Sequence, residues 1–344
     1  MKTLSDIEFS LLNDWQRDFP LVARPYAALA AKLGCDEPAV LDTLADLKRS
    51  GHVSRIGAVF RPHVLGFSTL AAVACPEDRL EAVARIIDAH PEVNHNYERE
   101  HRYNLWFVVT APTRDAVDTV LADIHRATGL KPLDLPMQAD YHIDLGFRLA
   151  REGAPAVAHP SRPRPHLNAS GPRLDAAVLR THLQSADYCL AAGLEDGLDL
   201  TPTPFAALAA RCGLDEMQCL ARLQRLLALS IVRRFGVVVR HRELGYTANA
   251  MVVWDVPDDS VARVGQLLAE QPAVTLCYQR PRRLPEWPYN LFSMVHGQDR
   301  ASVLAELDAL RQRLDLQSIP CQPLFSQRRF KQCGARYAGL AQAA

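Results

Sequence analysis

"RPYAALAAKLGCDE" at residues 24–37 recurs as "TPFAALAARCGLDE" at residues 203–216. The two copies align with an offset of 179 residues, the distance along the chain from Pro25 to Pro204. The same offset, without a gap, pairs Arg55 with Arg234, Gly57 with Gly236, Arg61 with Arg240 and Gly66 with Gly245. A period of this length is too long for a solenoid repeat and indicates a duplicated module. We therefore expect two related halves that pack together as a pseudo-dimer within one chain.

Each half is predicted to begin with short helices followed by a strand. Pro25 and Gly34 are typical of the start and stop of a helix. The next helix, from residue 36 to 50, places its apolar residues on one face, and "VSRIGAVF" after it is typical of a strand. In the second half the equivalent segments are helices 203–212 and 215–229 and a strand at 231–239. This arrangement predicts a winged helix-turn-helix in each half.

The remainder of each half alternates strands and helices in the order βαββαβ, which is typical of a ferredoxin-like domain. In the first half the expected elements are strands 68–76, 92–99, 104–111 and 130–136 and helices 77–90 and 113–127. In the second half they are strands 246–255, 273–280, 290–296 and 316–322 and helices 257–271 and 298–313. The predicted fold is therefore α+β, a duplicated module of the Lrp/AsnC-like type. The predicted boundaries are 1–62 and 174–241 for the winged helices, 63–150 and 242–344 for the ferredoxin-like domains, and 151–173 for a Pro-rich linker.

Composition excludes several classes of protein. The 344 residues have a formal net charge of +0, so no general electrostatic attraction to nucleic acid or anionic membrane is expected. No apolar run approaches the roughly 20 residues of a membrane-spanning helix, and the N-terminus does not resemble a signal peptide. The eight cysteines are scattered without C-x-x-C spacing, which predicts reduced thiols, no intrinsic metal site and a cytoplasmic protein.

The helix-turn-helix is predicted to be a poor reader of DNA. The expected reading helix, residues 36–50, is acidic along most of its length, and its basic residues Lys48 and Arg49 stand at its far end. The second copy also begins with two acidic residues, although Arg222 and Arg225 follow. Acidic side chains at the start of a helix would repel phosphates, or alternatively would cap the helix. We expect this unit to serve as a packing scaffold.

The stretch "NHNYEREHRYNLWF" at residues 94–107 is unusually polar for a strand between apolar neighbours. If the strand continues far enough, strict alternation puts these residues on one face: Val93, His95, Tyr97, Arg99 and His101. Such a face suits a planar anionic ligand, because Tyr can stack, Arg can pair with carboxylates and His can transfer protons near neutral pH. The alternative is a solvated edge strand whose histidines have no function.

The second copy of this strand differs in an informative way. Leu276 stands at the position equivalent to His95, and the loop that follows, "PRRLPEWP" at 281–288, is longer and adds Arg282, Arg283 and Trp287. This difference predicts one active site with its chemistry on the first half. The second half would hold ligand or be a degenerate copy.

Further basic residues gather after the wings and in the C-terminal tail. Arg61 and His63 follow the first wing, and Arg240 and His241 follow the second. The tail "FSQRRFKQCGARY" at 325–337 places Lys331 and several arginines among aromatic residues. Such a tail could bind nucleic acid or be solvated. The neutral net charge favours a small ligand with several negative charges.

Several long strings of the sequence resemble the siroheme decarboxylase family, in the form with two homologous subunits fused in one chain. These strings are "HNYEREHRYNLWF" (95–107), "CYQRPRRLPEWPYNLF" (277–292), "MVHG" (294–297), the wings "RIGAVFRPHVLGF" and "RRFGVVVRHRELGY", and the tail "RRFKQCGARY" (328–337). The resemblance covers nearly all of both halves outside the linker. It implies an Lrp/AsnC-like fold and removal of the carboxyl groups of the two acetate side chains of siroheme, giving 12,18-didecarboxysiroheme in heme d1 biosynthesis of denitrifying bacteria.

The resemblance and the chemistry together imply roles for particular residues. Loss of CO₂ leaves electron density on a methylene carbon, which a proton donor must quench, and cations must hold the other carboxylates. We expect His95 and His101 to donate protons or position the acetate, with Tyr97 assisting. The expected carboxylate-binding residues are Arg61, Arg99, Arg240, Arg280, Arg282, Arg283 and Lys331. Trp106, Trp287 and His241 are expected to stack on the macrocycle or contact its iron. Leu276, where some relatives carry His, counts against a second equivalent site.

The same reading sets expectations for partners. We expect siroheme or a related iron-tetrapyrrole as ligand, no further cofactor, no nucleic acid, no membrane and a possible homodimer of the fused chain. The alternative is a tetrapyrrole-responsive transcription regulator of the Lrp/AsnC type, with the same fold and ligand but without a reaction.

Overall fold

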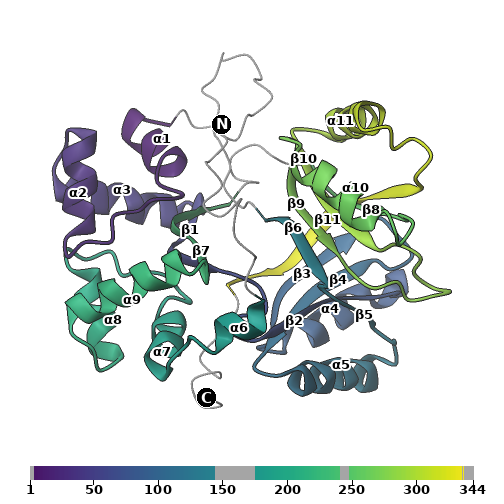
Figure 1. Cartoon of the computed structure of the whole chain (residues 1–344), viewed down its shortest axis with the longest axis horizontal. Coiled ribbons are helices and arrows are strands. Elements are labelled where there is room, and N and C mark those ends of the chain that lie inside the picture. The colour runs from purple at the N-terminus through teal and green to yellow at the C-terminus, as the bar shows by residue number, and fades with distance from the viewer. Residues whose placement is uncertain (1–3, 144–174, 241–247, 335, 337–344) are drawn as a thin grey trace.

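The computed structural model describes residues 4–143, 175–240, 248–334 and 336. These residues form two lobes, one made mainly of helices and the other built around β-strands, as Figure 1 shows. Each lobe contains segments from both halves of the chain, so the duplicated modules are intertwined rather than placed in sequence. The predicted linker 151–173 and His241 lie outside the described residues.

The helical lobe contains both winged helix-turn-helix units. The first consists of α1 (Asp6–Asn13), α2 (Pro25–Leu33), α3 (Glu37–Arg49) and strand β1 (Val53–Phe60). The second consists of α7 (Ser185–Gly193), α8 (Pro204–Arg211), α9 (Glu216–Ala228) and strand β7 (Val232–Val239), preceded by α6 (Ala176–Arg180). Helices α6 and α7 were not anticipated from the sequence.

The acidic residues at the start of the reading helices are caps. Asp36 accepts a hydrogen bond from the backbone N–H of Ala39 at 2.9 Å, and Asp215 accepts one from Gln218 at 2.7 Å. A side-chain oxygen at this position satisfies an N–H group that the helix itself leaves unpaired. The capping alternative is thus confirmed for Asp36 and Asp215.

The two wings pair with each other. Strands β1 and β7 form an antiparallel ribbon with Gly57 opposite Gly236. A Cβ atom on Gly236 would lie 2.4 Å from the carbonyl oxygen of Trp15, so the strand can pass this backbone only where a side chain is missing. One apolar core runs through both units and includes Leu11, Leu44, Leu208 and Leu223.

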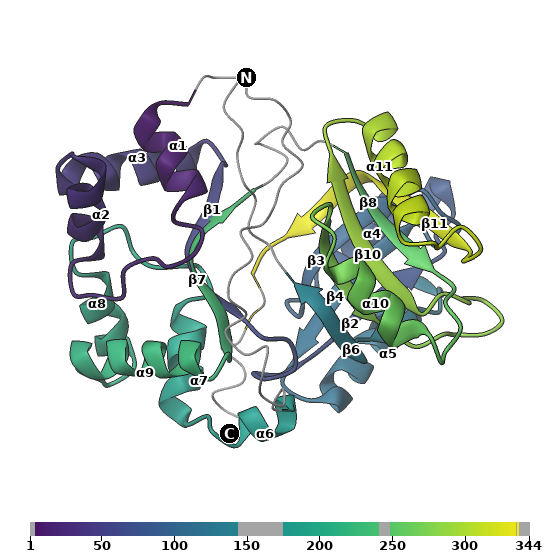
Figure 2. The same ribbon diagram turned by 45° about the horizontal axis from the view of Figure 1, so that its top comes forward.

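The second lobe, on the other side in Figures 1 and 2, is an intertwined pair of ferredoxin-like domains. Its first-half elements are β2 (Phe67–Val73), α4 (Leu80–Asp88), β3 (Val93–Arg99), β4 (Leu105–Ala111), α5 (Arg114–Thr128), β5 (Leu133–Pro136) and β6 (Ala139–Ile143). Its second-half elements are β8 (Ala248–Trp254), α10 (Val261–Ala269), β9 (Val274–Gln279), β10 (Leu291–Gly297), α11 (Arg300–Arg313) and β11 (Cys321–Gln332). Within the described residues, nine strands form one sheet in the order β5-β2-β4-β3-β11-β8-β10-β9-β6.

Each half contributes a strand segment that pairs with the sheet of the other half. The first part of β11 pairs with β8 of its own half, and its second part, from Ser326 to Gln332, pairs with β3 of the first half. In return, β6 leaves the first half and pairs with β9 of the second. The predicted last strand, 316–322, was therefore placed too early. Most of the basic tail is a strand of the sheet, although Arg328 and Arg336 in it are exposed.

A β-bulge changes which residues of β3 share a face. Val93 pairs with Val109 but His95 pairs with Val108, so Asn94 is the extra residue. Val93 packs in the core under the helices, whereas the bulge turns His95 to the opposite face. The prediction that Val93 shares the face of His95 was wrong, because one inserted residue inverts the alternation. The same bulge occurs in β9 of the second half, between Val274 and Leu276.

The faces of the two half-sheets without helices enclose a shared core. Trp106, Trp287, Phe292 and Leu324 are buried there with residues from both halves. On the opposite faces, α4 and α5 cover one half-sheet, and α10 and α11 cover the other. Two cores under helices and one between the halves account for the apolar content of this lobe.

Two buried arginines join the halves at this shared core. Arg99 donates to the carbonyl oxygen of Leu324 at 2.9 Å, and Arg280 donates to the carbonyl oxygen of Leu135. Leu135 pairs with Leu70 and Leu324 with Met251, which are equivalent positions in the two halves. The two contacts are thus related by the internal duplication. Each arginine is only 8% exposed.

Cys189 and Cys212 form a disulfide, so the expectation of reduced thiols throughout was wrong for this pair, which the fold brings together between α7 and the end of α8. Among the described residues, no helix is long and apolar enough to cross a membrane. No cluster of three or more potential metal ligands occurs in the same residues.

We expect Arg99→Met and Arg280→Met each to lower the free energy of unfolding by about 1.5–3 kcal/mol, the usual contribution of a hydrogen bond from a charged group. Urea denaturation followed by tryptophan fluorescence measures this loss. Arg85→Met, which removes an exposed guanidinium from α4, should change stability by less than about 0.5 kcal/mol. Equal stability of all three variants would contradict a joining role for the two buried arginines.

Candidate active site

The face of β3 that carries His95 is completed by the tail strand of the other half. In the β3–β11 pairing, Tyr97 stands opposite Arg329 and His95 stands opposite Gln332. Residues directly opposite in an antiparallel pair lie on the same side of the sheet. The His95 and Tyr97 rings lie nearly parallel, 6.3 Å apart, and Arg329 donates to the amide oxygen of Gln332 at 3.1 Å. We call His95, Tyr97, Arg329 and Gln332 the histidine face.

Hydrogen bonds define the protonation of His95. The amide nitrogen of Asn94 donates to the hydroxyl of Thr110 at 3.0 Å, which leaves the amide oxygen of Asn94 as an acceptor. That oxygen lies 2.7 Å from Nδ1 of His95, so Nδ1 carries the proton. Nε2 of the neutral ring therefore presents a lone pair. A lone pair in this position can accept a proton from a ligand or coordinate a metal that a ligand carries.

A second arginine acts on the same imidazole from the helical lobe. Burial, together with the nearby guanidinium of Arg55 on β1, lowers the pKa of His95 to about 4. Gly334, just after β11, lies so close that a Cβ atom on it would be 3.8 Å from the guanidinium carbon of Arg55. Arg55 thus reaches the histidine face from the wing. The sequence singled out Arg55 only as part of the repeat and of the wing string, not as a site residue.

His101 does not belong to the histidine face. Strand β3 ends at Arg99, about 13 Å from His95 at the usual rise of a strand, and His101 lies in the turn beyond it. The backbone N–H of Tyr103 donates to Nδ1 of His101 at 2.9 Å, and the imidazole meets the edge of Trp287 at 5.3 Å between ring centres. Burial lowers the pKa of His101. The prediction that both histidines share one strand face was wrong, because the strand stops between them.

Lys331 lies on the opposite side of the sheet from His95. Its register partner is Asn96, whose amide donates to Asp88 at the end of α4. The ammonium group of Lys331 donates to the carbonyl oxygens of Asp88 and His90, at 2.8 and 3.0 Å. It therefore caps the C-terminal end of α4 and is turned away from the histidine face. Arg329 is the basic residue that the tail supplies to that face.

The remaining predicted carboxylate ligands are mostly engaged within the protein. Arg282 is paired with Asp255 and Asp258, and Arg283 donates to the backbone of Asp134 at 2.7 Å. Arg99 and Arg280 join the halves, as described above. Arg61 and Arg240 are partly exposed after the two wings, where their role stays a prediction.

The two predicted stacking residues are buried. Trp106 is 2% exposed and donates to the carbonyl oxygen of Tyr103, and Trp287 is 0% exposed. Their rings meet at 5.1 Å in the core between the halves. Neither indole presents a face to a ligand in this structure.

The equivalent face of the second half carries a different set of side chains. Leu276 and Tyr278 take the places of His95 and Tyr97. Opposite Tyr278 stands Asp140 of β6, the position that corresponds to Arg329, and Asp140 is paired with Arg233 of β7. This face therefore lacks the imidazole and carries a carboxylate with its own cationic partner. That the chemistry lies on the first half stays a prediction.

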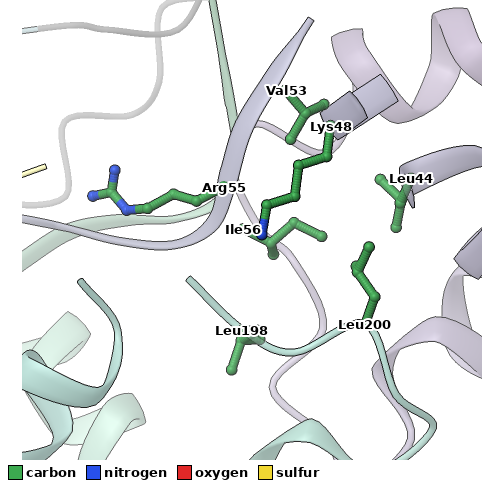
Figure 3. Close-up of a pocket in the computed structure, with 7 residues that line it drawn as sticks. All are labelled: Leu44, Lys48, Val53, Arg55, Ile56, Leu198 and Leu200. Atoms are coloured by element: carbon green, nitrogen blue, oxygen red, sulfur yellow. The ribbon is translucent and has the colours of Figure 1, made fainter. Parts of the chain in front are cut away.

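The arginines of the second reading helix point inward. Arg222 and Arg225 both pair with Asp187, at 3.2 and 2.6 Å, and the side chain of Asp187 is fully buried. Two guanidinium groups held by one buried carboxylate are positioned for packing rather than for the major groove. The helical lobe does contain a small cavity, shown in Figure 3 and lined in part by Leu44, Leu198 and Lys48. Its space of about 10 Å³, roughly one water molecule, excludes a macrocycle.

Comparison with known proteins agrees with this geometry. An AsnC-like ligand binding domain matches residues 64–142 and 243–331, and a siroheme decarboxylase NirDL-like HTH domain matches residues 8–53 and 193–233. The siroheme decarboxylase NirDL subunit of Paracoccus pantotrophus is 43% identical over 98% of this chain and 99% of its own length.

This chain belongs to the siroheme decarboxylase NirDL family.

Solved structures of the family share the architecture. The crystal structure of the siroheme decarboxylase NirDL is similar with a TM-score of 0.66 and 26% identity, covering 98% of this chain and 97% of that one. A second structure, of NirDL in complex with an iron-uroporphyrin III analogue, is similar with a TM-score of 0.65 at 26% identity, covering 98% and 96%. The predicted family and the predicted duplicated α+β fold are confirmed.

Stability should depend on pH through His95. Its pKa lies below the ordinary value of 6.5 in the folded protein, so between pH 7 and pH 5 only the unfolded chain takes up this proton. The free energy of unfolding should therefore fall as the pH falls, by at most about 2 kcal/mol from this residue, and less because the ring is partly exposed. Urea denaturation at pH 7 and pH 5 should show a smaller fall for His95→Gln than for wild type. His125→Gln, which removes an exposed imidazole from α5, is the control, and an unchanged slope in His95→Gln would contradict the expectation.

Proposed function

We propose that this protein removes the carboxyl groups of the two acetate side chains of siroheme, yielding 12,18-didecarboxysiroheme and CO₂. Family membership supports the reaction, and the related structure with an iron-uroporphyrin III analogue supports a tetrapyrrole as ligand. The observation that carries the proposal within this chain is the histidine face. It combines a neutral imidazole, a phenol and a guanidinium group on one side of a sheet.

The reaction needs a group that can take and return one proton. An acetic acid side chain becomes a methyl group and CO₂, so the carboxyl proton must move to the methylene carbon as the carbon–carbon bond breaks. The bonding electron pair passes to that carbon and is shared with the macrocycle. Nε2 of His95 carries a lone pair, so it can take the carboxyl proton and then deliver it to the carbon. Atoms and charge balance without any oxidant or reductant.

The low pKa of His95 suits the first of these steps. An imidazole with a pKa of about 4 is unprotonated at neutral pH and is ready to accept a proton. Once it is protonated, the same low pKa makes it a strong acid toward the methylene carbon. The prediction of His95 as proton donor is kept here as a proposal, with proton acceptance added before donation.

Cations near the histidine face would hold the carboxylates that do not react. Arg329 lies opposite Tyr97 on this face, and Arg55 reaches it from β1. A carboxylate paired with a guanidinium group is stabilised as an anion and is held in place, whereas the reacting carboxyl group lies next to His95. We also propose Arg61 and Arg240 as carboxylate contacts, Tyr97 as a stacking residue and His241 as a contact to the substrate iron.

The expected partners follow from the same proposal. We propose no cofactor beyond the iron-tetrapyrrole substrate, and no separate subunit, since both homologous halves lie in one chain. We propose that the protein does not bind DNA, because Arg222 and Arg225 of the second reading helix are held by buried Asp187. The same contacts count against the alternative of a tetrapyrrole-responsive transcription regulator. Pairing of two fused chains stays a proposal.

Anaerobic incubation of the full chain with siroheme, followed by mass analysis of the tetrapyrrole, tests the reaction. We expect stepwise loss of two CO₂ molecules. Intact siroheme after prolonged incubation would overturn the proposal, and tight binding of operator DNA in a gel shift at low salt would favour the regulator instead.

The two histidines should behave differently when they are replaced. We expect His95→Gln to lower kcat by about 10²–10³-fold, the usual loss when a general acid or base is removed, with siroheme affinity within about threefold of wild type. His101→Gln should lower kcat by less than about tenfold, because His101 packs against Trp287 outside the histidine face. Single-turnover rates and absorbance titrations separate the two effects. A larger loss of kcat in His101→Gln would contradict the assignment of the chemistry to the histidine face.

A further inference from the structure

A second group of basic side chains gathers where the helical lobe meets both half-sheets. Arg180, the last residue of α6, donates to the carbonyl oxygen of His63 at 2.6 Å, and its guanidinium lies 4.6 Å from the ring centre of Phe67. The His63 ring also faces Phe67, at 6.4 Å. Figure 2 shows α6 between the two lobes and near β2, to which Phe67 belongs. Neither His63 nor Arg180 lies on the histidine face.

Arg280 forms the buried side of this group. It is 8% exposed and lies 4.6 Å from the ring centre of Tyr278. The guanidinium groups of Arg280 and Arg180 both act electrostatically on the imidazole of His63. Burial and these two cations lower the pKa of His63, while Asp140 opposes them. The imidazole is thus neutral at pH 7 and sits between two positive charges.

Among the described residues around His63, positive charge exceeds negative charge. Arg180, Arg280 and the carboxylate of Asp140 all act electrostatically on His63, and Asp140 is paired with Arg233. The other nearby carboxylate, of Asp134, is shared by Arg114 and Arg283. Among the described residues these guanidinium groups outnumber the carboxylates near them, and an anionic ligand would reduce the cost of burying the excess positive charge.

Three buried side-chain nitrogen atoms of this group make no hydrogen bond to the described residues. Nε2 of His63, Nε of Arg180 and Nε of Arg280 are all buried and lack a hydrogen-bond partner within the described part of the chain. Buried polar atoms are ordinarily paired, so three such atoms around one imidazole suggest a missing acceptor. His63 also has a φ of 62°, in the left-handed region that non-glycine residues seldom occupy.

We propose that His63, Arg180 and Arg280 form a carboxylate-binding subsite between the two halves, separate from the histidine face. Its ligand class is an organic carboxylate held by guanidinium N–H groups and by an N–H of the imidazole. Under the proposed function, on which the identity of the ligand rests, the carboxylate is a side chain of the tetrapyrrole. The subsite binds and performs no chemistry, since its face carries Leu276 in place of the histidine.

Binding of two iron porphyrins to the full chain tests the proposal. Iron uroporphyrin III bears a carboxylate on every side chain, whereas iron mesoporphyrin bears carboxylates on only two. His63→Gln and Arg180→Gln should each weaken binding of iron uroporphyrin III by about tenfold, the value of one charge-assisted hydrogen bond. Binding of iron mesoporphyrin should weaken by less than about twofold. Absorbance titrations give both affinities.

The control variant removes an arginine that makes the same kind of hydrogen bond at a distant place in the protein. Arg79 donates to the carbonyl oxygen of Thr128 at 2.7 Å, much as Arg180 donates to His63, and Arg79→Gln should leave both affinities unchanged. Equal losses for the two porphyrins, or no loss beyond that of Arg79→Gln, would overturn the subsite. Because the readout is binding, the subsite can be confirmed even if siroheme is not decarboxylated. It can also fail while decarboxylation is observed, so the two proposals are separable.

Discussion

The exchange of strands between the two halves is the constraint on which the rest of the structure depends. Strand β11 begins beside β8 of its own half and ends beside β3 of the other, and β6 makes the reciprocal crossing. Backbone hydrogen bonds across both junctions leave the central strands without a free edge, which is a common liability of sheets. The buried guanidinium of Arg99 adds a bond between the halves at the same place. Neither half-sheet is complete without a segment of the other half.

This exchange also builds the candidate active site. His95 and Tyr97 come from the first half, but Arg329 and Gln332 beside them come from the last strand of the second. The wing supplies Arg55 from a third direction. A site assembled from three distant segments is rigid because each segment is anchored by its own sheet pairing, and rigidity is what catalysis by positioning requires.

Duplication lets the two copies diverge while the scaffold stays the same. Both halves keep the bulge and the tyrosine that follows it, but Leu276 replaces the imidazole and Asp140 stands where the other half has Arg329. In the helical lobe, the arginines of the second reading helix are likewise used for packing, since buried Asp187 pairs with both of them. The helix-turn-helix units thus keep their packing contacts, while the residues proposed to carry function lie elsewhere.

Local signals in the sequence determined much of this protein. The repeat predicted the duplicated fold, Pro25 and Gly34 marked a helix, and Leu276 is the basis for proposing that the chemistry belongs to the first half. Tertiary structure alone decided which side chains meet: the bulge at Asn94 inverts the alternation of β3, and the pairing of β11 with β3 turns Lys331 away and brings Arg329 to the face that carries His95. The physical reason is that periodicity and capping act within a few residues, whereas strand register depends on partners hundreds of residues away, and a shift of one residue moves every side chain to the other face.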